Sequence, residues 1–198
     1  QEEMEMLDLA LENYITSLSY NEKLDNDMGR VICKNSIAKV YIKKKRYEEA
    51  LNLIEETIPI AMQMENGFLI ARLYNNLGWA QLRMNQNRNA ELSLLKGYSV
   101  AENHNLKDEL SQASHLLSEL YEVKKNYEKA LKYKTEAIGL DREILNDGTI
   151  RYVNDILFRY DSEKKGNELA VLAKQNEVVR LKLRKNRTLL LIGVLSLF

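Results

Sequence analysis

Apolar side chains recur every three or four residues along residues 3–160, which is the spacing of amphipathic helices. The first such stripe consists of Met4, Leu7, Leu11, Tyr14, Ile15 and Leu18. Short, mostly polar segments separate the stripes, and their Asn, Asp and Gly residues suit helix ends. The pattern predicts an all-α chain, with helices over about 3–24, 29–44, 47–64, 68–84, 87–104, 107–124, 127–145 and 149–165.

The helices also repeat as pairs. Ala50, Ala90 and Ala130 lie 40 residues apart, and a fixed period of this length is typical of stacked repeats. Two further positions keep small residues in the same register, namely Ala38, Gly78 and Ser118, and Thr57, Gly97 and Ala137. Small residues at fixed places indicate that the two helices of each pair approach closely.

This spacing resembles the tetratricopeptide repeat. A small residue is followed by an aromatic residue three positions on, by alanine twelve positions on, and later by a large apolar and a small residue, as in Ala38, Tyr41, Ala50, Ile54 and Thr57. The resemblance implies a solenoid of helical hairpins, here with 40-residue repeats instead of the common 34. It covers residues 1–160, with a partial first repeat, repeats at about 29–64, 68–104 and 107–145, and a terminal helix.

The pattern changes in residues 161–187. Leu169, Leu172, Asn176, Val179 and Leu183 alternate by three and four residues, which is typical of a coiled-coil seam with a buried Asn at an a position. The sequence thus predicts a linker helix that forms a homodimer. The alternative is an amphipathic helix that folds back on the repeats.

Residues 188–198 are all apolar or small and follow the basic residues Lys182, Arg184, Lys185 and Arg187. Eleven residues are fewer than the roughly 20 that span a bilayer, so we interpret the run as the start of a transmembrane helix. The alternative is a hydrophobic tail. The order solenoid, coiled coil and span is similar to membrane-anchored bacterial sensors with a histidine kinase or helix-turn-helix output domain. That resemblance implies periplasmic repeats, and we adopt this location as the prediction. The alternative is a cytoplasmic location, which the basic residues before the apolar run favour.

Composition and the absence of known motifs reduce the number of function classes that this region could belong to. Lys and Arg number 29, as do Asp and Glu, and this balance predicts no nucleic-acid partner for the region. The single cysteine, Cys33, excludes an internal disulfide. The sequence contains no phosphate-binding loop, nucleophile elbow or metal-binding pair of histidines, so we expect no cofactor, no metal and no enzymatic activity in this region.

The resemblance implies instead that the first helix of each repeat lines a concave groove for a protein or peptide. The groove positions are occupied by Asn35, Lys39, Lys43, Arg72, Asn75, Trp79, Arg83, Gln112, His115, Glu119 and Glu122. Trp79 beside arginine is a typical binding hot spot, although it could equally pack against a neighbouring repeat. The expected function is the sensor or scaffold part of a signalling protein, with an assembly scaffold as the alternative.

Overall fold

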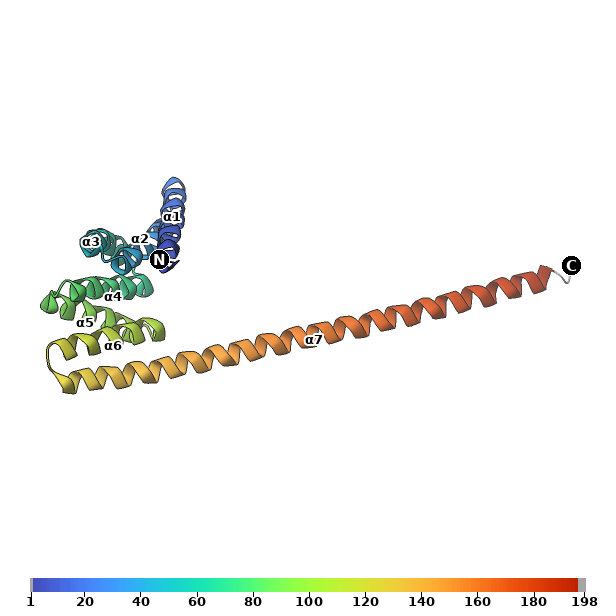
Figure 1. The fold of residues 1–198 in the computed structure, drawn as a ribbon. Helices are drawn as coiled ribbons and strands as arrows, with labels where there is room; N and C mark the ends of the chain where they lie inside the picture. Colours follow the sequence, from blue (N-terminus) through green and yellow to red (C-terminus); the bar gives the residue numbers. More distant parts are fainter. Residues whose placement is uncertain (1, 196–198) are drawn as a thin grey trace. The chain divides into compact units, whose positions relative to one another are not determined.

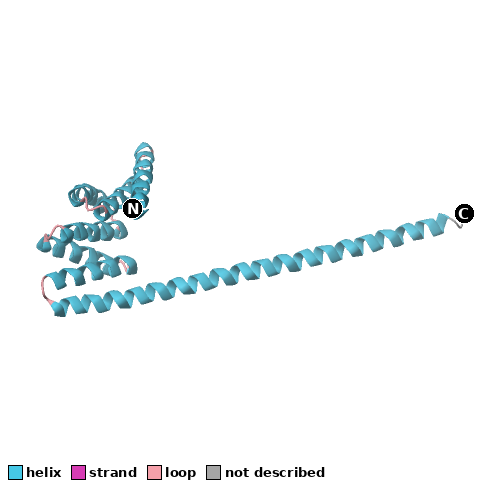
Figure 2. Ribbon diagram, viewed as in Figure 1, coloured by secondary structure: helices cyan, strands magenta, loops and turns pink. Residues whose placement is uncertain are grey.

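The structure is a computed structural model that describes the backbone of residues 2–195. It also describes their side chains, except at 2–3, 151, 153, 157, 160–161, 178–179 and 182–195. Within this part of the chain every regular element is a helix, and only short turns join them (Figures 1 and 2). The helices are α1 (Glu2–Lys23), α2 (Asp27–Lys43), α3 (Tyr47–Gln63), α4 (Gly67–Arg83), α5 (Asn87–Asn103), α6 (Lys107–Val123) and α7 (Tyr127–Leu195).

Helices α2 to α6 are all 17 residues long, and a new helix begins every 20 residues. Each turn has one residue in the left-handed region, and none of these residues is glycine: Asp25, Lys45, Glu65, Asn85, Asn105 and Lys125. At Lys45, which has a φ of 61°, Arg46 N donates to Tyr41 O at 2.8 Å and Lys45 N donates to Ile42 O at 3.0 Å. This is the Schellman arrangement, which satisfies the last carbonyls of α2.

The small residues mark the contacts between paired helices, as predicted. Ala50 and Ala90 are fully buried, and a Cβ atom built on Gly78 would lie 2.5 Å from Leu94 Cγ. In the third pair, Ser118 Oγ donates to the carbonyl of Ala130 at 3.0 Å. The predicted helical-repeat architecture is therefore confirmed.

Helix α7 departs from the prediction, because the expected turn at 145–148 is absent. Residues 149–165 do not form a separate helix, and the helix continues through the polar segment 161–166. Glycine costs only about 1 kcal/mol relative to alanine within a helix, so Gly148 and Gly166 do not by themselves end one. A Cβ atom on either would meet nothing within 4 Å, so no close packing favours a break there. By its contacts the chain forms two compact units, residues 1–145 and 146–198.

The predicted membrane anchor with periplasmic repeats is wrong. Among the described residues, no helix contains a stretch that is both apolar and long enough to cross a membrane. The apolar part of α7 begins only at Thr188, directly after a segment that contains Lys182, Arg184, Lys185 and Arg187. Residues 196–198 of the predicted span lie outside the described part of the chain.

The turn geometry yields a test of stability. Lys45→Gly should raise the free energy of unfolding by about 0.5–1 kcal/mol, because glycine adopts a positive φ without steric strain. The matched control is Lys43→Gly, which places glycine in the last turn of α2 and should lower stability by up to about 1 kcal/mol. Thermal and urea melts measure both changes. Equal destabilisation by the two variants would contradict the left-handed turn at Lys45.

Candidate functional site

The first unit contains two adjoining cavities along the first helices of the repeats. The basic cavity, of about 410 Å³, is lined by Leu7, Ala10, Tyr14, Asn35, Ser36, Lys39, Val40, Lys43, Arg72, Asn76 and Gln112. The tryptophan cavity, of about 720 Å³, is lined by Lys39, Trp79, Arg83, Asp108, Ser111, Gln112, His115, Leu116, Asp141, Ile144 and Leu145. Lys39 and Gln112 line both cavities, which therefore lie side by side, and we call the two together the groove.

Three cations gather in the basic cavity. Partial burial lowers the pKa of Lys39, and the positive charges of Lys43 and Arg72 lower it further. Among the described residues, no acidic side chain forms an ion pair with Lys39 or Lys43. Arg72 differs, because its Nε lies 3.2 Å from Glu109 Oε1 and its guanidinium lies 4.7 Å from the ring centre of Phe68. The cavity therefore carries a positive charge that the protein itself only partly balances.

Amide side chains connect the first helices of the three repeats. Asn76 Nδ2 donates to Asn35 Oδ1 at 2.9 Å, and Gln112 Nε2 donates to Asn76 Oδ1 at 3.4 Å. Asn35 and Asn76 are both buried. The resulting amide ladder joins α2, α4 and α6 along the basic cavity, and it places groups that can both donate and accept hydrogen bonds there.

Trp79 lines the tryptophan cavity and also packs against the hydrophobic cores on both sides of α4. The packing interpretation of this residue is therefore confirmed, and the binding hot spot stays a prediction. Its neighbour Arg83 forms a two-point ion pair with Glu119, in which Nη2 lies 3.1 Å from Oε2 and Nη1 contacts Oε1. This pair ties α4 to α6 at the edge of the groove.

A second polar cluster ties α6 to α7. His115 Nε2 lies 2.8 Å from Asp141 Oδ2, and Ser111 donates a hydrogen bond to Asp141 Oδ1. The Ser111 hydrogen bond, followed by the contact with His115, lowers the pKa of Asp141. The carboxylate thus stays ionised and holds His115 against the groove wall.

The structure brings most of the predicted groove residues together. Asn35, Lys39, Lys43 and Arg72 line the basic cavity, while Trp79, Arg83 and His115 line the tryptophan cavity. Glu119 and Glu122 line neither cavity. Glu119 is connected to the tryptophan cavity only through its ion pair with Arg83. Asn75 lies elsewhere, because it is fully buried and its Nδ2 donates to the carbonyl of Glu109 at 2.8 Å.

Sequence reasoning missed Asn76, Asp141 and the α1 residues Leu7, Ala10 and Tyr14 as groove residues. The 40-residue register pairs Asn35 with Asn75, whereas the hydrogen bond joins Asn35 to Asn76. The 40-residue spacing identifies equivalent positions in successive repeats. It does not say which of two neighbouring residues faces the previous helix, because that depends on how each repeat is rotated relative to the one before it. The stripe on α1 was the available signal for Tyr14.

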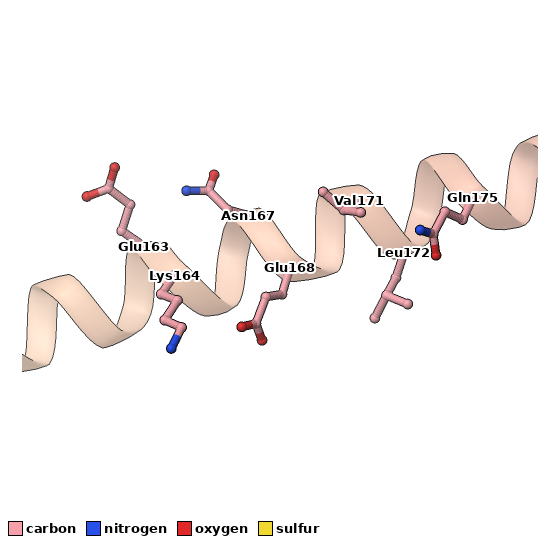
Figure 3. A pocket seen from close by; sticks show the side chains of 7 residues that line it. All are labelled: Glu163, Lys164, Asn167, Glu168, Val171, Leu172 and Gln175. Atoms are coloured by element: carbon pink, nitrogen blue, oxygen red, sulfur yellow. The ribbon is translucent and has the colours of Figure 1, made fainter.

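The predicted dimerisation seam lies on α7 in the second unit. Leu169 is 67% exposed and Leu172 is 54% exposed, and Asn176 is also exposed. Figure 3 shows seven side chains of this part of α7, among which Lys164, Glu168 and Leu172 project from the same side of the helix. Val179 and Leu183 lie in α7, but their side chains are outside the described part. The coiled coil stays a prediction.

The fold and the cavities define an α-helical repeat protein with a groove along the first helices of its repeats. The tetratricopeptide repeat family model matches residues 30–103, which supports the predicted resemblance. No curated protein sequence matches the chain.

Three solved structures share the fold. A Rap protein complexed with competence and sporulation factor has a TM-score of 0.65 at 23% identity, over 72% of this chain and 40% of that one. Aspartyl phosphate phosphatase F from Bacillus subtilis has a TM-score of 0.63 at 17% identity, over 71% of this chain and 37% of that one. BtubC from P. vanneervenii has a TM-score of 0.58 at 16% identity, over 69% of this chain and 57% of that one.

At these identities the solved structures show a helical-repeat fold, and the tetratricopeptide match is confined to residues 30–103. The comparisons do not extend to the predicted membrane-anchored signalling relatives. The chain spans about two fifths of the Rap protein and of the phosphatase.

The amide ladder can be tested by a double-mutant cycle. Asn35→Ala and Asn76→Ala should each cost about 1–3 kcal/mol, because each leaves a buried amide unpaired. The double variant should cost less than the sum by at least about 0.5 kcal/mol, as expected for residues in contact. Denaturant melts measure the three values. Asn35→Ala combined with Asn89→Ala, at an exposed position of α5, is the additive control. Full additivity of the Asn35 and Asn76 changes would exclude their hydrogen bond.

Proposed function

We propose that the chain is a protein- or peptide-binding module that holds an extended segment of its partner in the concave groove. The observation that carries the proposal is the pair of adjoining cavities, since unpaired lysines and the amide ladder line one and a half-buried tryptophan lines the other. Such a mixture supplies charge, side-chain amides that can hydrogen-bond to a peptide backbone, and an aromatic anchor. The solved complex of a Rap protein with competence and sporulation factor supports the proposal, since the two chains share this fold.

Within a larger protein, this module would act as the sensor part of a signal-transduction system, and we assign it no catalytic step. The alternative is an assembly scaffold or adaptor without an output domain. The identity of the captured partner separates the two roles. A signalling regulator or a secreted peptide would favour sensing, whereas several subunits of one complex would favour scaffolding.

Trp79→Ala tests the groove directly. Loss of this anchor should weaken partner binding by about 2 kcal/mol or more, in a pull-down from native host extract followed by titration of the recovered partner. Because Trp79 also packs against both cores, Trp79→Phe is included to preserve much of that packing, and circular dichroism reports helicity. The matched control is Leu92→Ala, an exposed apolar residue on α5 outside both cavities. If Trp79→Ala recovers every partner as well as Leu92→Ala does, Trp79 is not part of the site.

We further propose that residues 169–187 of α7 pair with a second copy of the chain. The exposed Leu169 and Leu172 lie seven and four residues before Asn176, and this spacing supports the pairing because apolar residues at a and d positions pack against a partner helix. The proposal assigns Asn176 to an a position, where a buried amide favours a parallel two-stranded coiled coil.

Asn176→Leu should strengthen association and make its stoichiometry less uniform, because the amide no longer selects two strands. Analytical ultracentrifugation of the full chain measures both effects. Asn167→Leu makes the same change at an f position, away from the seam, and should leave association unchanged. A chain that stays monomeric at the highest accessible concentration, with or without Asn176→Leu, would rule out the pairing.

A further inference from the structure

We propose that Asn66 is a site of spontaneous deamidation, a covalent change in which its side-chain amide is lost and the turn between α3 and α4 acquires an aspartate or an isoaspartate. Asn66 precedes Gly67, and the sequence contains no other asparagine that is followed by glycine. Asparagine is a thermolabile residue. A following glycine makes it more reactive, because glycine has no side chain to hinder attack and adopts conformations that other residues avoid.

The structure places this pair at the start of α4. Asn66 is the N-cap residue, with φ of −87° and ψ of 96°, and its Oδ1 accepts a hydrogen bond from Leu69 N at 3.1 Å. Gly67 is the first residue of the helix, and the first N–H groups of a helix have no partner within it. The nitrogen of Gly67 can therefore react without opening α4. Only the cap hydrogen bond of Asn66 has to break.

Packing against His104 favours glycine at position 67. A Cβ atom built on Gly67 would lie 2.5 Å from His104 Cδ2 and 2.6 Å from His104 Nε2, so a larger residue would displace this ring. Gly67 is buried, whereas Asn66 is only partly buried. Water therefore reaches the side-chain amide of Asn66, while the contact with His104 keeps a glycine beside it.

The reaction needs only water as a co-reactant. The backbone nitrogen of Gly67 loses its proton to hydroxide and attacks Cγ of Asn66. A bond forms between this nitrogen and Cγ, the bond from Cγ to Nδ2 breaks, and Nδ2 leaves as ammonia after taking a proton from water. Water then opens the cyclic imide. Hydrolysis at Cγ yields aspartate, whereas hydrolysis at the main-chain carbonyl carbon of position 66 yields isoaspartate.

The two products affect α4 differently. An aspartate keeps an oxygen in the capping position and adds a negative charge, which the N-terminus of a helix favours. An isoaspartate carries the main chain through the former side chain, so the backbone gains a methylene group and the cap is lost. Helix α4 supplies Arg72, Trp79 and Arg83 to the groove. Only the isoaspartate should therefore destabilise the helix that positions them.

Two other turns provide internal controls, because they have the same cap hydrogen bond without the glycine. Asn26 has φ of −92° and ψ of 92°, and its Oδ1 accepts from Gly29 N at 3.1 Å. Asn126 Oδ1 accepts from Lys129 N, also at 3.1 Å. Aspartate follows Asn26, and tyrosine follows Asn126. Asn126 is the closer match to Asn66, because Asn26 Nδ2 is also held by Asn21 Oδ1 at 2.8 Å.

Peptide mapping by mass spectrometry tests the proposal on the full chain, incubated in warm buffer of slightly alkaline pH. Asn66 should be converted at least about tenfold faster than Asn26 or Asn126, because only its neighbour lacks a side chain. Chromatography should resolve an aspartate and an isoaspartate form of the peptide that contains position 66.

Thermal melts test the effect on α4. Aged wild-type protein should melt at a lower temperature than fresh protein, in proportion to its isoaspartate content. Asn66→Ser removes the amide and keeps a capping oxygen, so this variant should melt at the same temperature before and after ageing. Asn66→Asp should melt at the same temperature as fresh wild-type protein or at a higher one.

Two further changes separate the glycine from the cap. Tyr127→Gly places a glycine after Asn126 at an exposed position and should raise the conversion of Asn126 at least about fivefold. Gly67→Ala should slow the conversion of Asn66 about tenfold. Because the added Cβ atom would meet His104, Gly67→Ala is made together with His104→Ala and is compared with His104→Ala alone.

Retention of Asn66 during ageing, or equal conversion of Asn66 and Asn126, would overturn the proposal. An unchanged rate at Asn66 when Gly67→Ala is added to His104→Ala would overturn it too, as would unchanged reactivity of Asn126 in Tyr127→Gly. If the aged protein contains isoaspartate but melts as fresh protein does, the effect assigned to α4 is wrong.

Discussion

The close approach of paired helices at small residues is the constraint on which the first unit depends. At Gly78 the backbone of α4 comes so near to α5 that an added Cβ atom would lie 2.5 Å from Leu94 Cγ. Ala50 and Ala90 allow the same approach at fully buried positions. Each pair leaves one helix on the inner side, so the groove is a consequence of how tightly the hairpins close. A larger residue at these positions would overpack the contact and displace the helices that carry the cavity residues.

Polar contacts then hold successive hairpins in one arrangement. The amide ladder joins α2, α4 and α6, the ion pair between Arg83 and Glu119 joins α4 to α6, and Asp141 joins α6 to α7. Exposed ion pairs contribute little to stability, whereas the buried amides are costly to leave unpaired. The ladder therefore determines more of the relative placement of the repeats than the charges do. Arg72 and Arg83 form ion pairs, whereas Lys39 and Lys43 form none within the described part of the chain. The two lysines are therefore the groove cations that remain available to a ligand.

Charge along the groove is arranged by repeat order. The first complete repeat supplies Lys39 and Lys43, the second supplies Arg72 and Trp79, and the third supplies Asp108 and Asp141. A solenoid stacks its repeats in sequence, so a change of side-chain type from one repeat to the next becomes a gradient in space.

The sequence by itself determined the repeat frame and most of the groove. Positions such as Ala38, Ala50 and Ala90 are visible as a period because the same helix contact recurs, and the first-helix positions of Lys39, Arg72 and Trp79 follow from that period. Only the tertiary structure decided between Asn75 and Asn76 as the partner of Asn35, because a register does not contain the rotation between repeats. It also decided that α7 continues through residues 145–148. Asn, Asp and Gly permit a helix to end there, but the outcome depends on whether another helix offers enough buried surface to favour the turn.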